Sequence, residues 1–195
     1  MNTDKKNYFK IALKFFLGLF LCLFVRLIPV RAPNIEPILA TMMPFSRAYG
    51  ALVGFSFAVL SILLYDVITH TLGVQTFFTV FAYGVLGLWS ANYFSAKGGS
   101  AFGGRDKNIR ARDYVKFAII GTLFFDAMTG LTVGPIFFHQ SFMQSLVGQI
   151  PFTALHLLGN ITFALILSPA IYHSLIRKKK KEGPSFINTF NPKTI

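Results

Sequence analysis

Two aspartates within apolar stretches are the residues of this sequence best suited to binding or proton chemistry. Asp66 and Asp126 each stand in an aromatic-Asp-x-x-Thr pattern, and the two patterns form a weak internal repeat. An ionisable side chain near the centre of a membrane costs about 2.5–3.5 kcal/mol, so it persists where it binds a ligand or pairs with another charge. The aspartates therefore indicate either a ligand pocket, or carboxylates that are hydrated near the membrane surface or paired with Arg26 or Arg31.

Further polar residues fall on the side of the membrane where we place both aspartates. Asn34 and Glu36 precede a predicted helix, so ligand contact and helix capping are equally open roles for Glu36. His139 lies in a predicted loop on the same side. We predict a substrate site composed of Arg26, Arg31, Asn34, Glu36, Asp66, Asp126, His139, Gln149 and Asn160.

Metal and nucleophile chemistry lack the residue spacing that they need. Zinc sites require three or four ligands in close array, whereas the sequence has no H-x-x-x-H pattern and a single cysteine, Cys22. Gln149, His156 and Asn160 are more typical of buried hydrogen-bonding groups, with His156 and Asn160 one helical turn apart. No serine stands in a nucleophile elbow. We therefore predict no catalytic residue, no metal and no cofactor.

The composition indicates that these residues belong to a membrane protein. Hydrophobic residues make up 53% of the chain and charged residues 13%, whereas soluble domains carry about a quarter charged residues. The formal net charge of +12 comes mainly from basic blocks, such as Lys97 to Lys116 and Arg177 to Lys181. Such blocks mark the cytoplasmic ends of membrane segments and contact lipid headgroups. We therefore predict a multi-pass protein of the plasma membrane and no nucleic-acid partner.

The stretch from Pro33 to Thr69 determines the predicted topology. A membrane-spanning helix needs about 20 apolar residues, and this stretch is too long for one crossing and short for two full ones. We predict a short helix at 36–46, a turn around Pro44 to Arg47, and a full helix at 48–69. Two passes here keep the basic segment 97–112 in the cytoplasm, together with both termini.

The predicted fold is a single all-α integral membrane domain, a six-helix bundle with a short second helix. Gly50, Gly54 and Ala58 at four-residue spacing indicate close packing of the third helix. The segment LTVGPIFFHQSFMQS (131–145) contains no Lys or Arg, which is typical of an outer loop. The predicted helices are about 8–30, 36–46, 48–69, 75–95, 113–131 and 146–176, with a cytoplasmic loop at 96–112 and a mobile tail at 182–195.

The segments RAPNIEP (31–37) and PFSRAYG (44–50) give the chain a family resemblance. Together with six segments whose two ends are cytoplasmic, they make it resemble the substrate-binding (S) component of energy-coupling factor (ECF) transporters over nearly its whole length. The resemblance implies that a vitamin or related micronutrient enters from outside and binds between the outer loops and the outer ends of helices 4 to 6. It also implies a membrane coupling subunit and two ATPase subunits as partners in the lipid bilayer.

One feature of that family departs from its usual form in this sequence. The resemblance implies that helix 1 docks on the coupling subunit through alanines four residues apart. Here Ala12 is followed by Phe16, and Gly18 with Cys22 is the nearest substitute.

Three function classes remain. The first is the substrate-binding subunit of an ATP-driven ECF-type importer, which itself catalyses nothing. The second is a proton-coupled secondary transporter that uses Asp66 and Asp126, and the third, less favoured, is a membrane-embedded enzyme. The two carboxylates favour a cationic or hydrogen-bond-donating ligand, while the arginines could hold an acidic end, and the sequence leaves this choice open. The rings available for stacking on a ligand include Tyr65, Phe77, Tyr83 and Phe138.

Overall fold

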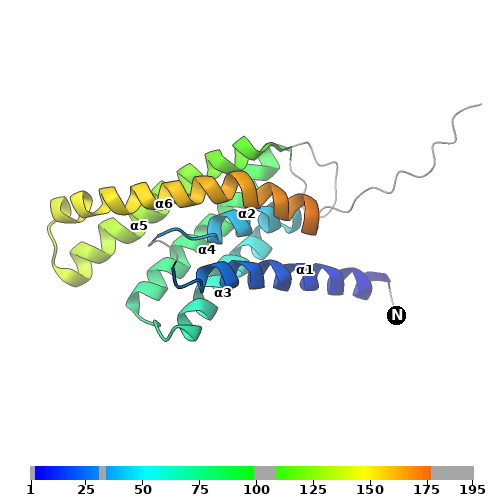
Figure 1. Ribbon diagram of the computed structural model, residues 1–195, viewed down its shortest axis with the longest axis horizontal. Coiled ribbons are helices and arrows are strands. Elements are labelled where there is room, and N and C mark those ends of the chain that lie inside the picture. The colour runs from blue at the N-terminus through cyan, green and yellow to red at the C-terminus, as the bar shows by residue number, and fades with distance from the viewer. Residues whose placement is uncertain (1–2, 31–33, 99–108, 177–195) are drawn as a thin grey trace, which may run out of the picture.

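Six stretches of the sequence form α-helices, and the described residues contain no strand. The structure is a computed structural model that describes residues 3–30, 34–98 and 109–176. Successive helices run in alternating directions (Figure 1); they are α1 (Thr3–Arg26), α2 (Ile38–Tyr49), α3 (Ala51–Ile68), α4 (Val74–Ala96), α5 (Ala111–Phe138) and α6 (Phe142–Ile171), which continues as a π-helical turn (Tyr172–Ile176). The predicted all-α fold with six helices and a short second helix is confirmed.

Five segments are long and apolar enough to cross a membrane, namely Asn7–Arg26, Ala51–Ile68, Val74–Ala96, Ala111–Phe138 and Phe142–Ile176. Large apolar side chains lie on the outside of the bundle, among them Phe20, Leu52 and Ile166, each more than half exposed. Such a surface suits lipid rather than water as the solvent. The chain is therefore a multi-pass membrane protein, and the identity of the membrane stays a prediction.

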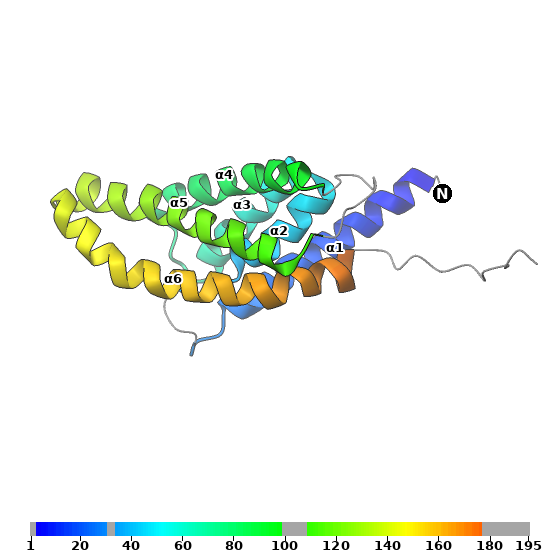
Figure 2. The same ribbon diagram turned by 90° about the horizontal axis from the view of Figure 1, so that it is seen from above.

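The short helix α2 lies at the centre of the bundle. Its residues 38–47 are all buried, and it contacts each of the five other helices. Figure 2 shows it between α3 and α4 on one side and α1 and α6 on the other. With 12 residues at about 1.5 Å rise per residue, α2 is shorter than a hydrocarbon layer of about 30 Å. Its apolar side chains therefore pack against protein and not against lipid.

The two described chain ends lie at the same end of the bundle (Figure 1). Lys14 Nζ of α1 donates a hydrogen bond of 2.8 Å to the carbonyl oxygen of Ile176, the last described residue. The α3–α4 and α5–α6 connections lie toward the opposite end. That the chain ends face the cytoplasm stays a prediction.

Pro44 lies inside α2 and does not end it, so the predicted turn around Pro44 to Arg47 is wrong. Proline has no N–H to donate to the carbonyl oxygen four residues earlier, which here belongs to Ala40. Ser168 Oγ of α6 donates to this carbonyl oxygen at 2.7 Å. The chain turns instead at Gly50, whose φ of 93° and ψ of 179° suit glycine almost alone.

Several other helix ends differ from the predicted bounds. α1 ends at Arg26 rather than near residue 30. α5 continues through Pro135 to Phe138 and α6 begins at Phe142, so most of the predicted outer loop 131–145 is helical. Most of the predicted cytoplasmic loop 96–112 and the whole tail 182–195 lie outside the described residues.

A capping box sets the start of α6. Ser141 Oγ accepts a hydrogen bond from Gln144 N at 3.3 Å, and Ser141 N donates to Gln144 Oε1 at 2.9 Å. The S-x-x-Q spacing is a known sequence signal for a helix start. It places the helix start at Phe142, four residues before the predicted one.

Small residues let α3 and α4 approach closely, as their spacing predicted. A Cβ atom on Gly54 would lie 2.6 Å from Gly87 O, and a Cβ atom on Gly87 would lie 2.6 Å from the backbone of Gly54. Ser46 Oγ of α2 donates to Gly87 O at 3.0 Å at the same point. Three helices therefore meet here, around two glycines.

Gly18 and Cys22 of α1 face the interior of the bundle. Cys22 is fully buried, and a side chain on Gly18 would collide with the ring of Phe45 in α2. Gly18 therefore packs against α2, and neither residue lies on the outer surface of the bundle.

Arg47, near the end of α2, is buried between aromatic rings. Its Nη1 donates to Tyr114 Oη at 2.7 Å, and its guanidinium lies 3.7 Å from the ring centroid of Tyr172. A cation over an aromatic face is stabilised by the ring quadrupole. Arg47 thus joins α2 to α5 and to the π-helical turn.

Candidate functional site

A cavity of about 220 Å³ holds charged side chains on one part of its wall and rings on another. It lies among the ends of α1 and α3, the segment before α2, the start of α4, and the middle of α5 and α6. We name it the Asp66 cavity. Its lining residues are Arg26, Asn34, Glu36, Asp66, Thr71, Gln75, Thr79, Tyr83, Phe125, Phe152 and His156. Four of the nine predicted site residues, Arg26, Asn34, Glu36 and Asp66, thus line one cavity.

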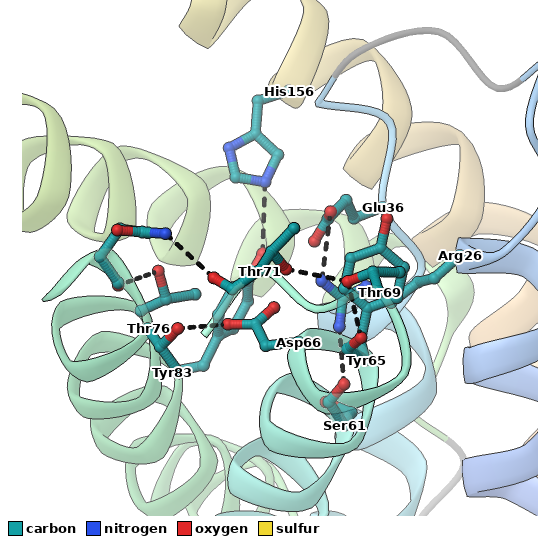
Figure 3. Close-up of polar contacts among 12 residues, drawn as sticks. Arg26, Glu36, Ser61, Tyr65, Asp66, Thr69, Thr71, Thr76, Tyr83 and His156 are labelled. Atoms are coloured by element: carbon teal, nitrogen blue, oxygen red, sulfur yellow. Dashed lines mark hydrogen bonds and ion pairs between the residues drawn. The ribbon is translucent and has the colours of Figure 1, made fainter. Parts of the chain in front are cut away.

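Arg26 is held by groups of this chain on several sides (Figure 3). Its Nη1 donates to Ser61 O at 2.6 Å, and its Nη2 lies 3.4 Å from Glu36 Oε1. The guanidinium also lies 3.8 Å from the centroid of the Tyr65 ring. Arg26 is only 5% exposed, so its charge is balanced and enclosed within the protein.

Asp66 is oriented by the first turn of α4. Thr76 Oγ1 donates to Asp66 Oδ2 at 2.5 Å and accepts a hydrogen bond from Gly73 N at 3.1 Å. Within the part of the chain that the structure describes, no Lys, Arg or His nitrogen lies within ion-pair distance of this carboxylate. Figure 3 shows Asp66, in that view, between Thr76 and the Arg26–Glu36 pair.

His156 and Asp126 form a buried pair beneath the cavity. His156 Nδ1 lies 2.7 Å from Asp126 Oδ1, and the two residues are 3% and 2% exposed. An ionised carboxylate can only accept, so Nδ1 is the donor in this pair when it carries a proton. The other ring nitrogen, Nε2, lies 3.4 Å from Tyr83 Oη. Asp126 therefore does not line the cavity but contacts His156, which does.

His156 was predicted to be a buried hydrogen-bonding group and not a residue of the substrate site. Its position beside Asp126 could not be found from spacing, because the two residues lie on different helices. A local signal did exist for the wall of the cavity: Gln75, Thr79 and Tyr83 stand four residues apart in α4 and all line it. Four-residue spacing places side chains on one helical face.

The other predicted site residues lie elsewhere. His139 is exposed in the α5–α6 turn, where its φ of 53° is left-handed. Asn160 is buried, and its Nδ2 donates to Thr122 Oγ1 at 2.8 Å. Gln149 lines a second cavity of about 390 Å³, with Gln140 and Gln144. Arg31 lies outside the described residues.

The rings proposed for ligand stacking divide in the same way. Tyr83 lines the Asp66 cavity, whereas Tyr65 stacks on Arg26. Phe77 and Phe138 are 71% and 68% exposed. Phe125 and Phe152, which were not among the predicted stacking rings, supply the remaining apolar wall.

Metal binding has no visible basis in this cavity. Across residues 3–30, 34–98 and 109–176, no group of three or more His, Cys, Asp and Glu side chains is arranged to hold a metal ion. The arrangement instead offers hydrogen-bonding groups, carboxylates and aromatic faces, which is the usual chemistry of a small-molecule site.

The fold and the cavity define a multi-pass helical membrane protein with a cavity of about 220 Å³ lined by charged, polar and aromatic side chains. Comparison with family models, curated proteins and solved structures gives no match to the chain. The resemblance to ECF S components therefore rests on the sequence segments described above.

Proposed function

We propose that the chain is the substrate-binding subunit of an ATP-driven ECF-type importer, which captures a vitamin or related micronutrient from outside the cell. In this proposal a membrane coupling subunit and two ATPase subunits supply the energy, and the chain itself catalyses no reaction. The membrane is the plasma membrane, with the Asp66 cavity facing outward.

The observation that carries the proposal is the Asp66 cavity itself. Part of its wall comes from the α1–α2 and α3–α4 connections, which lie away from the two described chain ends, and part from the middle of α5 and α6. Its wall combines Asp66 with the rings of Tyr83, Phe125 and Phe152. A membrane protein keeps ionisable groups in such a place where they serve a ligand or an ion.

The pair formed by His156 and Asp126 favours a second candidate, a proton-coupled secondary transporter. Both side chains are buried within spanning helices, and histidine changes its charge near physiological pH more readily than other side chains. In this candidate the pair would take up and release a proton during transport, and no ATPase subunit would be needed.

Reconstitution separates the two candidates. The purified chain in liposomes, with any ligand that co-purifies identified by native mass spectrometry, is assayed for uptake of that ligand. The importer proposal expects tight binding without uptake by the chain alone, and ATP-dependent uptake once a coupling subunit and two ATPase subunits are present. Uptake by the chain alone, driven by a pH step, would contradict it and support the secondary transporter.

A further inference from the structure

The charged groups around the Asp66 cavity leave one carboxylate without a cation. Arg26 is balanced by Glu36 and donates to Ser61 O, and its Nε is enclosed away from solvent. Asp126 is bonded to His156. Among the described residues, the Asp66 carboxylate therefore has no cation beside it. Its side-chain hydrogen-bond donor there is the neutral hydroxyl of Thr76.

The described residues that line the cavity, taken together with Asp126, carry a net negative charge whether His156 is neutral or protonated. If His156 is neutral, Asp126 adds a second negative charge near Asp66, and if it is protonated the pair is neutral. Charges interact far more strongly in a membrane protein than in bulk water, because the surroundings have a low dielectric constant. A bound cation beside Asp66 would therefore be favoured, and an anion would be repelled.

Aromatic side chains form the deeper wall of the same cavity. The Tyr83 and Phe125 ring centroids are 4.4 Å apart, and the Phe125 and His156 centroids are 5.4 Å apart. Phe152 also packs against His156, at 5.9 Å between centroids. Such a wall accepts a flat apolar body, and its faces also attract positive charge.

We infer that the ligand is a small organic cation with a flat apolar part, whose positive group pairs with Asp66 while the flat part lies against Tyr83, Phe125 and Phe152. The volume of about 220 Å³ is below the range of about 300–1,000 Å³ for drug-sized ligands, which selects a compact molecule. This inference rests on the proposed function, since it names the substrate class of the same site.

Three probes of one size and different charge test the inference: benzamidine as the cation, benzyl alcohol as the neutral molecule and benzoate as the anion. Binding to the purified full-length chain in detergent is measured by titration calorimetry. We expect benzamidine to bind more tightly than benzyl alcohol, and benzoate to bind weakest.

Variants connect this order to Asp66. We expect Asp66→Asn to weaken benzamidine binding at least about tenfold and to leave benzyl alcohol binding nearly unchanged. Asp113→Asn is the matched control, because Asp113 is a carboxylate of the same bundle that pairs with Lys97 away from the cavity. Asp66→Glu keeps the charge and should keep the preference for the cation, which covers the case in which Asp66→Asn does not fold.

If the unmodified chain binds benzoate more tightly than benzamidine, the inference is overturned, and no variant is needed to show it. A site for anions that includes Arg31 would give this result. Equal benzamidine binding by Asp66→Asn and the unmodified chain, or no benzamidine binding at millimolar concentrations, would overturn it as well. The proposed function fails separately. A co-purified anionic ligand with ATP-dependent uptake would refute the cation alone, whereas Asp66-dependent cation binding with no ATP-dependent uptake would refute the importer alone.

Discussion

Asp66 and Asp126 stand in similar sequence patterns, yet their carboxylates have different surroundings. The threonine of each pattern makes the same local hydrogen bond: Thr69 Oγ1 and Thr129 Oγ1 each donate at 2.8 Å to the carbonyl oxygen four residues earlier. The aspartates differ because Asp126 meets His156 from α6, whereas Asp66 meets the neutral hydroxyl of Thr76. The repeat is therefore a feature of local helix chemistry, and each aspartate has its own role.

Removing the Asp126 carboxylate tests the strength of its pair with His156. We expect Asp126→Ala to lower the free energy of unfolding by about 3–5 kcal/mol, because it leaves one member of a buried pair without its partner. Asp126→Asn retains an oxygen that can accept from His156 Nδ1, so we expect a smaller loss of about 1–2 kcal/mol. Equilibrium unfolding in mixed micelles measures both. Equal stability of Asp126→Ala and the unmodified chain would show that the pair does not stabilise the fold.

The Ser168 hydroxyl donates the hydrogen bond that Pro44 of α2 cannot donate to the Ala40 carbonyl oxygen. We expect Ser168→Ala to lower the free energy of unfolding by about 1–3 kcal/mol, because the buried Ala40 carbonyl oxygen then has neither Pro44 nor Ser168 as a donor. Thr162→Ala on the same helix is the control. Its hydroxyl is exposed and donates to Leu158 O within α6, so we expect a change within about 0.5 kcal/mol. Equal losses from the two variants would contradict this account of Pro44.

At the scale of elements, α2 combines features that would be unfavourable in an isolated helix. It is short, contains a proline and carries Arg47, all within the buried centre of a membrane bundle. Each difficulty is met by a neighbouring element: α6 supplies Ser168, and α5 and the π-helical turn supply Tyr114 and Tyr172. The conformation of α2 thus depends on the helices around it.

The contact between α3 and α4 depends on the absence of side chains at their crossing. We expect Gly87→Ala to lower the free energy of unfolding by about 1–3 kcal/mol, because the new Cβ would lie 2.6 Å from the backbone of Gly54. Gly148→Ala is the control, since a Cβ there meets nothing within 4 Å. We expect the control to be neutral or stabilising by up to about 1 kcal/mol, as alanine favours helix over glycine. Thermal unfolding of both variants in detergent decides, and a stable Gly87→Ala would argue against this close packing.

At the scale of the whole molecule, the Asp66 cavity exists because the α1–α2 and α3–α4 connections lie against the middle of α5 and α6. Its lining residues extend along the sequence from Arg26 to His156 and come from α1, the segment before α2, and α3 to α6. A relative movement of α3–α4 and α5–α6 would therefore change the cavity, since each hairpin supplies part of its wall.

The predicted orientation in the membrane can be tested at this scale by labelling from outside the cell. Cys22 is fully buried, so it gives little background, and single cysteines can be introduced at exposed positions. We expect Ser141→Cys in the α5–α6 turn to react with an impermeant maleimide in intact cells, and Lys97→Cys at the opposite end to react only after lysis. The reverse pattern would place the cavity on the cytoplasmic side and contradict an importer's binding subunit.

By itself, the sequence determined the class of the protein and the number and type of its helices. Hydropathy, basic blocks and small-residue spacing act locally, so they predict spanning segments and close packing of α3 without knowledge of the fold. Helix ends were predicted less well where capping at Ser141 and continuation through Pro135 decided them.

Only the tertiary structure decided which polar groups satisfy one another. Ser168 reaches Ala40 across 128 positions, and His156 reaches Asp126 across 30. A side chain in a membrane bundle is free for a ligand only if no partner from another helix uses it, and such partners are not visible in local sequence. For that reason the sequence offered Asp66, Asp126 and the arginines as equal candidates, whereas the fold leaves Asp66 as the carboxylate of the cavity without a cation among the described residues.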